Sequence, residues 1–482
     1  MKKLNAGAAS RGSTNAITSL HGSVNVAAAA ASIARYVAKR AKTYDGIASD
    51  IWKHPETAFH EERSSAIYEK YLSSKGFSVT EFPEMKYSFV AERGSAGPVI
   101  AFMGEYDALP GMSQACGIER KPVGEGAPGH ACGHNLLGAG SLVAAETLAD
   151  LLEENGLPGR VRYYGCPAEE SLGRIPLVKA GRFDDADAVM TWHGADVNTP
   201  HRYATSANLA IVFSFKGRAS HAAMAPQAGR SALDAVQLFN LSLEFMREHL
   251  GPGILLHYVI SDGGQRPNIV PEKAATFLYV RAPIADTVRT VMKRIMKAAQ
   301  GAALMTETSF STEIKHGKCD YRPNDAIQDL LYEAMGVLPL PVPTAEETAF
   351  ARGLQATVEK GDRKATLEPI GAPVELLKAP IHLTLGDFGR GKRIGGSLDT
   401  GDVSYIVPTG QMNAATWPLG VGAHTWQSCA ASGSTWAFKA MRWAGSCMAL
   451  AGYVLATDPA SLNAAKAEHK AKALPYRSTM DL

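Results

Sequence analysis

Four short clusters of acidic, histidine and cysteine side chains are the candidates for chemistry in this sequence. Gly-Glu-Tyr-Asp occupies 104–107, His-Ala-Cys-Gly-His occupies 130–134, two glutamates follow at 169–170, and Trp-His stands at 192–193. A thiolate, imidazoles and carboxylates together form the ligand set of zinc or a similar transition metal. The residue types therefore indicate a metal site.

Cys132 and His134 lie two residues apart, with a glycine between them. In extended backbone such residues project to the same side, so both could bind one metal, and the glycine gives the chain room to approach. A cysteine on its own is more often a small buried apolar residue. Beside the other clusters we predict that Cys132 is a ligand instead.

Glu169 and Glu170 are adjacent carboxylates. They repel each other, and this is unfavourable unless positive charge stands nearby, which a metal would supply. One glutamate can then act as a ligand while its neighbour takes a proton from water, as metal-assisted amide hydrolysis requires. A solvated acidic turn is the commoner role for a single pair of glutamates, but the position directly after an apolar strand argues against it.

The elements expected around these clusters explain how they could meet. Apolar runs at 98–103, 160–166 and 186–192 predict buried strands that each precede a cluster, and a long helix is expected over 136–154. Alternating strands and helices predict an α/β fold with a mixed, largely parallel sheet flanked by helices. Ligands of such sheets bind at the carboxyl ends of the strands, so the clusters should converge there.

The middle of the chain has a different pattern. Strands expected at 208–215 and 274–281 flank helices expected at 231–249 and 285–302, which predicts an inserted α+β domain. We therefore expect a catalytic domain formed by residues 1–204 and 323–482, with 1–25 flexible, and a separate lid and dimerisation domain at 205–322.

Composition excludes several classes of protein. With 482 residues, 46% hydrophobic and 20% charged, the chain is neither largely disordered nor a small stapled scaffold. Its formal net charge of +2 gives no general attraction for nucleic acid or membrane surfaces, and no segment reads as a membrane span. The six cysteines show no framework spacing, as is typical of a reducing compartment, so we expect a cytoplasmic protein.

The motifs also resemble a known family, the aminoacylase and carboxypeptidase metallopeptidases with two metal ions, and within it the amidohydrolase branch. The resemblance covers about residues 35 to 460. It rests on motifs that occur in the family's order, at 54–56 with Glu61-Glu62, 104–111, 129–135, 167–170 and 192–193. The branch is suggested by residues 109–114, 397–404 and 424–427. Two departures are Asn135, where the wider branch commonly has aspartate, and Leu398, where threonine is usual.

This resemblance implies roles for seven residues of the expected catalytic domain. Glu169 would be the general base, and Asp107 would orient a ligand. Two divalent ions, Zn or Mn, would share their ligands among Cys132, His134, Glu170, His193 and His424.

For the inserted domain the resemblance implies three more functional residues. His221, within residues 217–223, would reach across a homodimer to the partner's active site and stabilise the tetrahedral oxyanion, although a lone histidine here could also be structural. Asn268 and Arg281 would bind substrate. The planar fork of Arg281 suits a substrate carboxylate, with a surface ion pair as the alternative.

The expected reaction is hydrolysis of the amide bond of an N-acyl amino acid. The substrate implied by the resemblance is p-aminobenzoyl-glutamate, cleaved to p-aminobenzoate and glutamate. Alternatives are a dipeptidase, a deacylase of another N-acyl amino acid, or a non-catalytic binding or regulatory component of a heteromeric hydrolase. The expected assembly is a homodimer through the lid domain, or a hetero-oligomer with a related A subunit.

Overall fold

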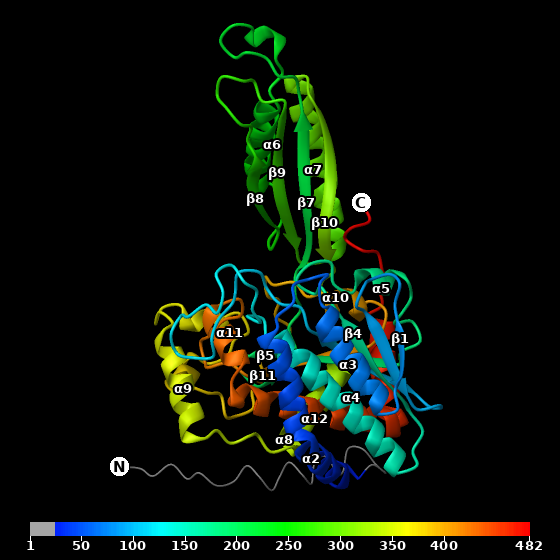
Figure 1. Ribbon diagram of the computed structural model, residues 1–482. Helices are drawn as coiled ribbons and strands as arrows, with labels where there is room; N and C mark the ends of the chain where they lie inside the picture. The colour runs from blue at the N-terminus through cyan, green and yellow to red at the C-terminus, as the bar shows by residue number, and fades with distance from the viewer. Residues whose placement is uncertain (1–24) are drawn as a thin grey trace. The chain divides into compact units, whose positions relative to one another are not determined.

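The computed structural model describes residues 25–482, which divide into two compact units (Figure 1). Unit 1 comprises the described residues up to Tyr203 together with Arg322–Lys392 and Val403–Leu474. Unit 2 comprises Ala204–Tyr321, Arg393–Asp402 and Pro475–Leu482. The expectation of flexibility for 1–25 falls on residues outside the described range, except for Asn25, which caps the first helix.

Unit 1 is built on a seven-stranded sheet with the strand order β1-β2-β4-β3-β5-β11-β6. The four central strands β4, β3, β5 and β11 are parallel, and antiparallel strands complete both edges. The strands are β1 (Ser78–Glu81), β2 (Phe89–Arg93), β3 (Val99–Glu105), β4 (Arg160–Cys166), β5 (Ala188–Ala195), β6 (Thr199–Pro200) and β11 (Thr409–Ala415).

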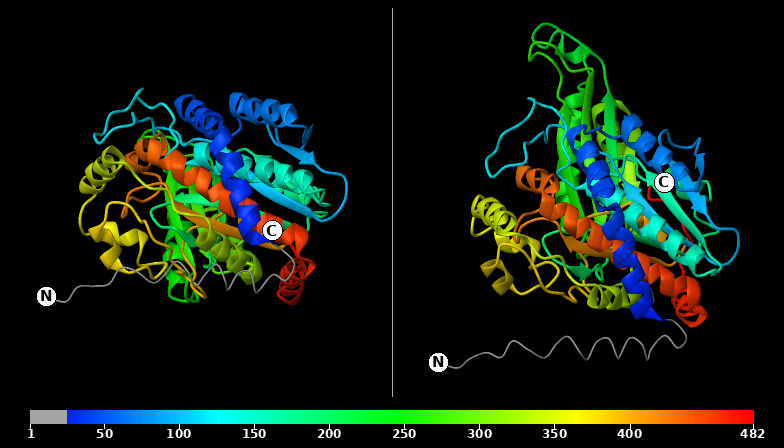
Figure 2. Two further views of the ribbon diagram at one scale, coloured as in Figure 1. Left: turned by 90° about the horizontal axis from the view of Figure 1, so that it is seen from below. Right: turned by 60° about the horizontal axis from the view of Figure 1, so that its bottom comes forward.

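Helices cover this sheet in layers. Helix α4 (His134–Glu154) packs against β3, β4 and β5, and α12 (Thr435–Thr457) packs against α4, β5 and β11. Helix α2 (Val26–Lys53) crosses both of them (Figure 2). The predicted α/β class, with a mixed sheet flanked by helices, is confirmed. The remaining helices are α3 (Glu62–Ser74), α5 (Ile175–Lys179), α8 (Asp325–Val337), α9 (Ala345–Ala356), α10 (Thr400–Ser404), α11 (Trp426–Ser432) and α13 (Pro459–Ala471).

Strand β11 was not anticipated from the sequence. Its residues, Thr-Gly-Gln-Met-Asn-Ala-Ala, are not typical of a strand, yet all seven are buried between β5 and β6. The polar side chains have partners, since Asn413 donates to the Tyr203 hydroxyl at 2.8 Å and the Gln411 amide lies 3.1 Å from Nδ1 of His201. Tertiary hydrogen bonds therefore stabilise a strand that local propensity does not predict.

Unit 2 has a four-stranded antiparallel sheet with the order β10-β7-β9-β8, and both of its long helices pack on one another and on that sheet (Figure 1). The strands are β7 (Ala207–Lys216), β8 (Leu255–Asp262), β9 (Lys273–Ala282) and β10 (Ser309–Lys318), and the helices are α6 (Ala232–Arg247) and α7 (Ala285–Thr306).

Two segments expected in the catalytic domain, 393–402 and 475–482, pack with unit 2 instead. The Tyr476 hydroxyl donates to the buried Asp402 at 2.9 Å, and Arg289 donates to the Arg477 carbonyl oxygen at 2.7 Å. These long-range hydrogen bonds have no signature in local sequence. Within residues 25–482, no helix has the length and apolar character needed to cross a membrane.

Candidate active site

The carboxyl ends of the parallel strands bring the predicted clusters of unit 1 together. Asp107 follows β3 by two residues, Glu169 and Glu170 follow β4, and His193 lies near the end of β5. Because these strands are parallel neighbours, their ends share one edge of the sheet. Their side chains meet there with Cys132 and with residues of α4.

The backbone around Cys132 and His134 differs from the extended conformation expected. Gly133 is left-handed, with φ of 78°, and His134 is already the first residue of α4. A left-handed residue turns the chain sharply into the helix, and glycine adopts it without steric cost. Both side chains still reach one site, and Asn135 fixes the loop by donating to the carbonyl oxygens of Ala48 and Ser432.

Asp107 orients two parts of the site at once. One carboxylate oxygen accepts from Nδ1 of His134 at 2.8 Å, and the other accepts from the Glu170 backbone N–H at 2.9 Å. The first bond places the His134 proton on Nδ1 and leaves Nε2 as the free lone pair. Asp107 thus has the contacts expected of a group that orients a ligand.

His193 and His424 approach the same thiol from other elements. Nδ1 of His193 donates to the Gly194 carbonyl oxygen at 2.6 Å, so Nε2 faces Sγ of Cys132 at 3.4 Å. Nε2 of His424 lies 3.1 Å from Oε1 of Glu170. The His424 backbone is left-handed, with φ of 60°, and its N–H donates to the Ala131 carbonyl oxygen beside Cys132.

The donor atoms form groups suited to metal ions. Three groups have their ligand atoms within 4.8 Å of one another, and two of these groups share Cys132. Nε2 of His134 is buried and lies 3.2 Å from Oε2 of Glu105, so an imidazole and a carboxylate present donor atoms to the same point. The side chains therefore fit two metal ions. The groups are Cys132, His134 and His193; Cys132, Glu170 and His424; and Glu105, His134 and Glu169.

The pKa values show strong electrostatic coupling. Burial and Glu170 act to raise the pKa of the Cys132 thiol, but His134 and His193 lower it to about 7. Burial would lower the pKa of His193, yet the Cys132 thiolate raises it to about 9. Hydrogen bonds to Cys132 and Glu170 raise the pKa of His424 to about 10. The acidic groups of this site therefore favour bound cations.

Glu105 and Arg174 also contribute to the site, although neither was given a role from the sequence. Oε2 of Glu105 lies 3.2 Å from Nε2 of His134, and its other oxygen pairs with the fully buried guanidinium of Arg174. Glu105 ends β3 and stands in the same polar cluster as Asp107, so its position at the end of an apolar strand was a usable signal. No sequence pattern marks Arg174 as a site residue, because only the fold brings it into an ion pair with Glu105.

His221 and Asn268 lie together in unit 2. Residue 221 forms a bridge with Ile269, and the Ala222 N–H donates to the Asn268 carbonyl oxygen at 3.0 Å. Nδ1 of His221 accepts from the Met224 N–H at 3.1 Å, so the neutral imidazole carries its proton on Nε2. The exposed His221 is therefore a hydrogen-bond donor through Nε2.

Arg281 lies at the other end of the unit 2 sheet. Its Nη1 donates to Oγ of Ser397 at 3.0 Å and to the Gly395 carbonyl oxygen at 3.2 Å. Asn268 precedes the first residue of β9, Lys273, whereas Arg281 is near its end. Arg281 lies eight residues beyond Lys273, or about 26 Å at roughly 3.3 Å per residue. The structure therefore does not bring Arg281 together with Asn268 within one chain.

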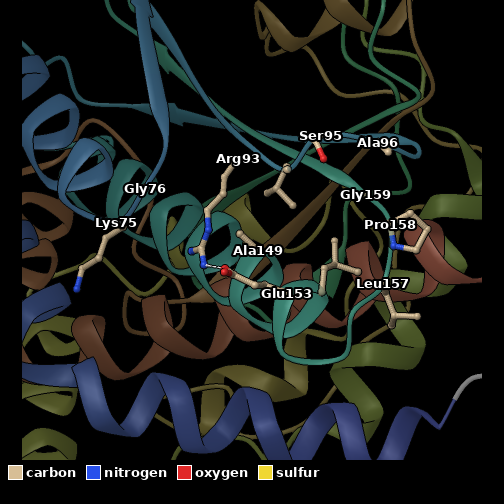
Figure 3. A pocket seen from close by; sticks show the side chains of 13 residues that line it. Lys75, Gly76, Arg93, Ser95, Ala96, Ala149, Glu153, Leu157, Pro158 and Gly159 are labelled. Atoms are coloured by element: carbon tan, nitrogen blue, oxygen red, sulfur yellow. Dashed lines mark hydrogen bonds and ion pairs between the residues drawn. The ribbon is translucent and has the colours of Figure 1, made fainter.

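A separate hollow of unit 1 contains none of the predicted site residues (Figure 3). It lies beside the carboxyl-terminal part of α4 and is lined by two cations, Lys75 and Arg93. Lys75 lies 3.7 Å from Glu146, and Arg93 is paired with Asp150 and Glu153. With its charge already neutralised, Arg93 offers no binding site for an anion.

The sequence of this chain is similar to a known protein family and to individual proteins. Residues 101–362 match the model of the peptidase family M20/M25/M40. The chain is 37% identical over 441 residues to the B subunit of p-aminobenzoyl-glutamate hydrolase from Escherichia coli (strain K12), covering 89% of this chain and 92% of that protein. It is 30% identical over 309 residues to the Xaa-Arg dipeptidase of Mus musculus, covering 61% and 68%.

The fold is also similar to a solved structure. The YXEP protein of Bacillus subtilis, described as a dinuclear metal-binding peptidase of the M20 family, superimposes with a TM-score of 0.56 at 16% identity. The match covers 87% of this chain and 99% of that one.

Proposed function

This chain belongs to the peptidase family M20/M25/M40 and is a hydrolase of amide bonds, and we propose that it cleaves p-aminobenzoyl-glutamate with two divalent metal ions. The observation that carries the proposal is the pair of ligand groups that share Cys132, with Glu169 in the adjoining group. The Escherichia coli relative supports the choice of substrate, because its name specifies p-aminobenzoyl-glutamate.

The proposed ligands are Cys132, His134, Glu170, His193 and His424, with Zn or Mn as the ions. When bound, such ions lower the pKa of a water and polarise the scissile carbonyl. Glu169 is nine-tenths buried, with a relative exposure of 6%, and the adjacent Glu170 is hydrogen-bonded through its N–H to Asp107. Glu169 takes a proton from the attacking water and returns it to the leaving amine.

His221 and the substrate-binding residues complete the proposal. The Nε2–H of His221 donates to the developing oxyanion, since its Nδ1 already accepts a backbone N–H. Asn268 and Arg281 bind substrate, and Arg281 pairs with a carboxylate of the glutamate part. Because these two residues lie at opposite ends of β9, one substrate would contact both only if one of them belonged to a second copy of the chain.

A homodimer through unit 2 would meet that requirement. Strand β8 is an edge strand with exposed Val259 and Ile260, and α6 exposes Leu241 and Phe245, the last at 68%. An exposed apolar surface beside an unpaired strand edge favours association with another copy. The Escherichia coli relative is named as the B component of its enzyme, which supports a related A subunit as the alternative partner.

We expect Phe245→Asp to convert a dimer into a monomer, because a charge at the centre of an apolar interface is unpaired. Light scattering on the purified chain measures the mass, and Glu154→Gln on the surface of unit 1 is the control. A wild-type chain that is monomeric at micromolar concentration would exclude the homodimer.

The proposed location is the cytoplasm. None of the six cysteines, all of which lie within residues 25–482, forms a disulfide, and this is typical of a reducing compartment. Fractionation of cells that express the chain, with marker enzymes for each compartment, tests it.

The function is tested by measuring metal content and glutamate release from p-aminobenzoyl-glutamate for the chain purified alone. We expect about two metals per chain and turnover, with Glu169→Gln retaining metal but losing roughly 10²-fold or more in kcat. Glu154→Gln, in a surface ion pair with Arg35, should behave like wild type. Metal without glutamate release would exclude this substrate, and failure to bind metal after reconstitution would overturn the ligand assignment.

A substrate panel separates the alternatives. Hippurate, N-acetyl amino acids and a dipeptide ending in arginine should be cleaved more slowly than p-aminobenzoyl-glutamate. A preference for one of them would make the chain a deacylase or a dipeptidase. Inactivity on every substrate, with restoration only by a second protein, would support a binding or regulatory role.

A further inference from the structure

The turn that carries Glu169 and Glu170 has an unfavourable backbone conformation. Ala168, the residue before them, is left-handed with φ of 57°. Its carbonyl oxygen accepts from the Ser171 N–H at 3.0 Å and from the Gly173 N–H at 2.8 Å, so the chain reverses sharply here. Residues with a Cβ disfavour this conformation, and surrounding contacts must hold it in place.

Two buried acidic side chains supply those contacts. Oε1 of Glu61 accepts from the Ala168 N–H at 2.7 Å, and Asp107 accepts from the Glu170 N–H at 2.9 Å. The N–H groups of residues 168 and 170 thus donate to side chains from two different parts of the chain. Glu61 is fully buried, and its second oxygen has no hydrogen-bond partner within residues 25–482.

Glu61 is itself fixed firmly. It directly precedes α3, where its carbonyl oxygen accepts from the Ser65 N–H at 3.0 Å. The Glu56 carboxylate caps the same helix by accepting from the N–H groups of Arg63 and Ser64, both at 2.8 Å. The Glu56 carbonyl oxygen accepts from the N–H of Ala108, which adjoins Asp107. The two residues that hold the turn therefore belong to one connected framework.

We propose that Glu61 is a positioning residue for catalysis. Its hydrogen bond to the Ala168 amide holds the left-handed turn, and this turn sets the positions of Glu169 as general base and Glu170 as metal ligand. The hydrogen bond of the Glu61 side chain is to the backbone N–H of Ala168 and not to the side chain of a proposed ligand. Glu61 acts through the backbone, so its effect rests on the proposed role of Glu169 as general base.

The hydrogen bond to the Ala168 N–H requires an accepting oxygen at the end of a side chain as long as that of glutamate. Three variants of Glu61 change the oxygen or the length of the side chain. Glu61→Gln keeps an accepting oxygen, Glu61→Asp places it one methylene too far away, and Glu61→Leu removes it at similar volume. We expect Glu61→Leu and Glu61→Asp to lose about 10²-fold in kcat with little change in KM, because misplaced catalytic groups have effects of that size. Glu61→Gln should stay within roughly fivefold of wild type.

A second-site change makes the test specific. Ala168→Gly removes the steric penalty of the left-handed conformation, so Glu61→Leu combined with Ala168→Gly should recover about tenfold in kcat over Glu61→Leu alone. A role in folding alone would predict recovery of stability without recovery of kcat. Glu56→Gln is the matched control, since it alters the cap of α3 without touching Ala168, and it should change the urea midpoint more than kcat.

Metal content by elemental analysis is measured for every variant, to separate a misplaced base from a lost ion. The proposal is overturned if folded Glu61→Leu or Glu61→Asp keeps wild-type kcat, or if Glu61→Gln is as impaired as Glu61→Leu. If Glu169→Gln retains full turnover, the role of Glu169 fails instead. The two failures are therefore distinguishable.

Discussion

A single carboxylate, Asp107, connects the two halves of the candidate metal site. It sets the tautomer of His134 with one oxygen and holds the Glu170 amide with the other. Both partners are donors, so both need an accepting oxygen. Loss of a group that holds a metal ligand in this way typically lowers metal affinity or activity by about 10- to 100-fold.

Asp107→Asn tests this role. Its amide NH₂ would face one of the two donors, so we expect metal affinity to fall by about 10- to 100-fold. Competition with a chromophoric chelator measures the affinity independently of turnover. Asp50→Asn, which alters a partly exposed pair with Arg63, is the control. Unchanged affinity in Asp107→Asn would mean that Asp107 does not orient a ligand.

At the scale of elements, close packing around α4 determines how the site is supported. Gly140 on α4 faces the buried Trp192 of β5, and a Cβ built on it would lie 2.5 Å from the indole Nε1. Trp192 in turn donates to the Leu137 carbonyl oxygen at 3.0 Å. The residue after Trp192 is His193, so the fit of helix against strand sets the position of a proposed ligand.

We expect Gly140→Ala to destabilise the protein by about 1–3 kcal/mol, the usual cost of overpacking a core. Gly46→Ala in α2 is the matched comparison, because a Cβ there meets nothing within 4 Å. That variant should be more stable by about 0.5–1 kcal/mol, since alanine favours a helix over glycine. Urea denaturation measures the free energy of unfolding of both variants. An unchanged value for Gly140→Ala would show that α4 and Trp192 can move apart at little cost.

For the whole molecule, buried histidines set the response to acid. Nδ1 of His382 accepts from the Asn198 N–H at 2.9 Å, which requires the neutral ring, and burial lowers its pKa to about 4. Burial likewise lowers the pKa values of His130 and His201 to about 3. Unfolded histidine titrates near 6.5, so the unfolded chain binds more protons over this range.

The lowered histidine pKa values make the folded protein less stable in acid. A lowered pKa contributes stability that is complete above about pH 6.5 and is lost as the pH falls toward 4, by up to about 1.4 kcal/mol per pH unit for each histidine. Urea midpoints of the metal-free chain between pH 7 and 4 measure it. His382→Gln should reduce the slope, and the exposed His249→Gln should leave it unchanged. Equal slopes for wild type and His382→Gln would contradict the prediction.

The sequence by itself determined the α/β class, the main strands and helices, and the clusters that meet at the sheet edge. The reason is that buried parallel strands read as continuous apolar runs, and polar residues just after them must share one edge. Asp107, Glu169, Glu170 and His193 were all identifiable in this way.

Only the tertiary structure decided the rest. Strand β11 depends on partners for its polar side chains, and segments 393–402 and 475–482 join unit 2 through distant hydrogen bonds. The buried polar side chains of Glu61, Glu105 and Arg174 each have a hydrogen-bond or ion-pair partner from a distant part of the chain. Such pairings join residues far apart in the chain, so the local sequence pattern cannot specify them. They are required in the folded protein because a polar group buried away from water is unfavourable unless it has a hydrogen-bond partner.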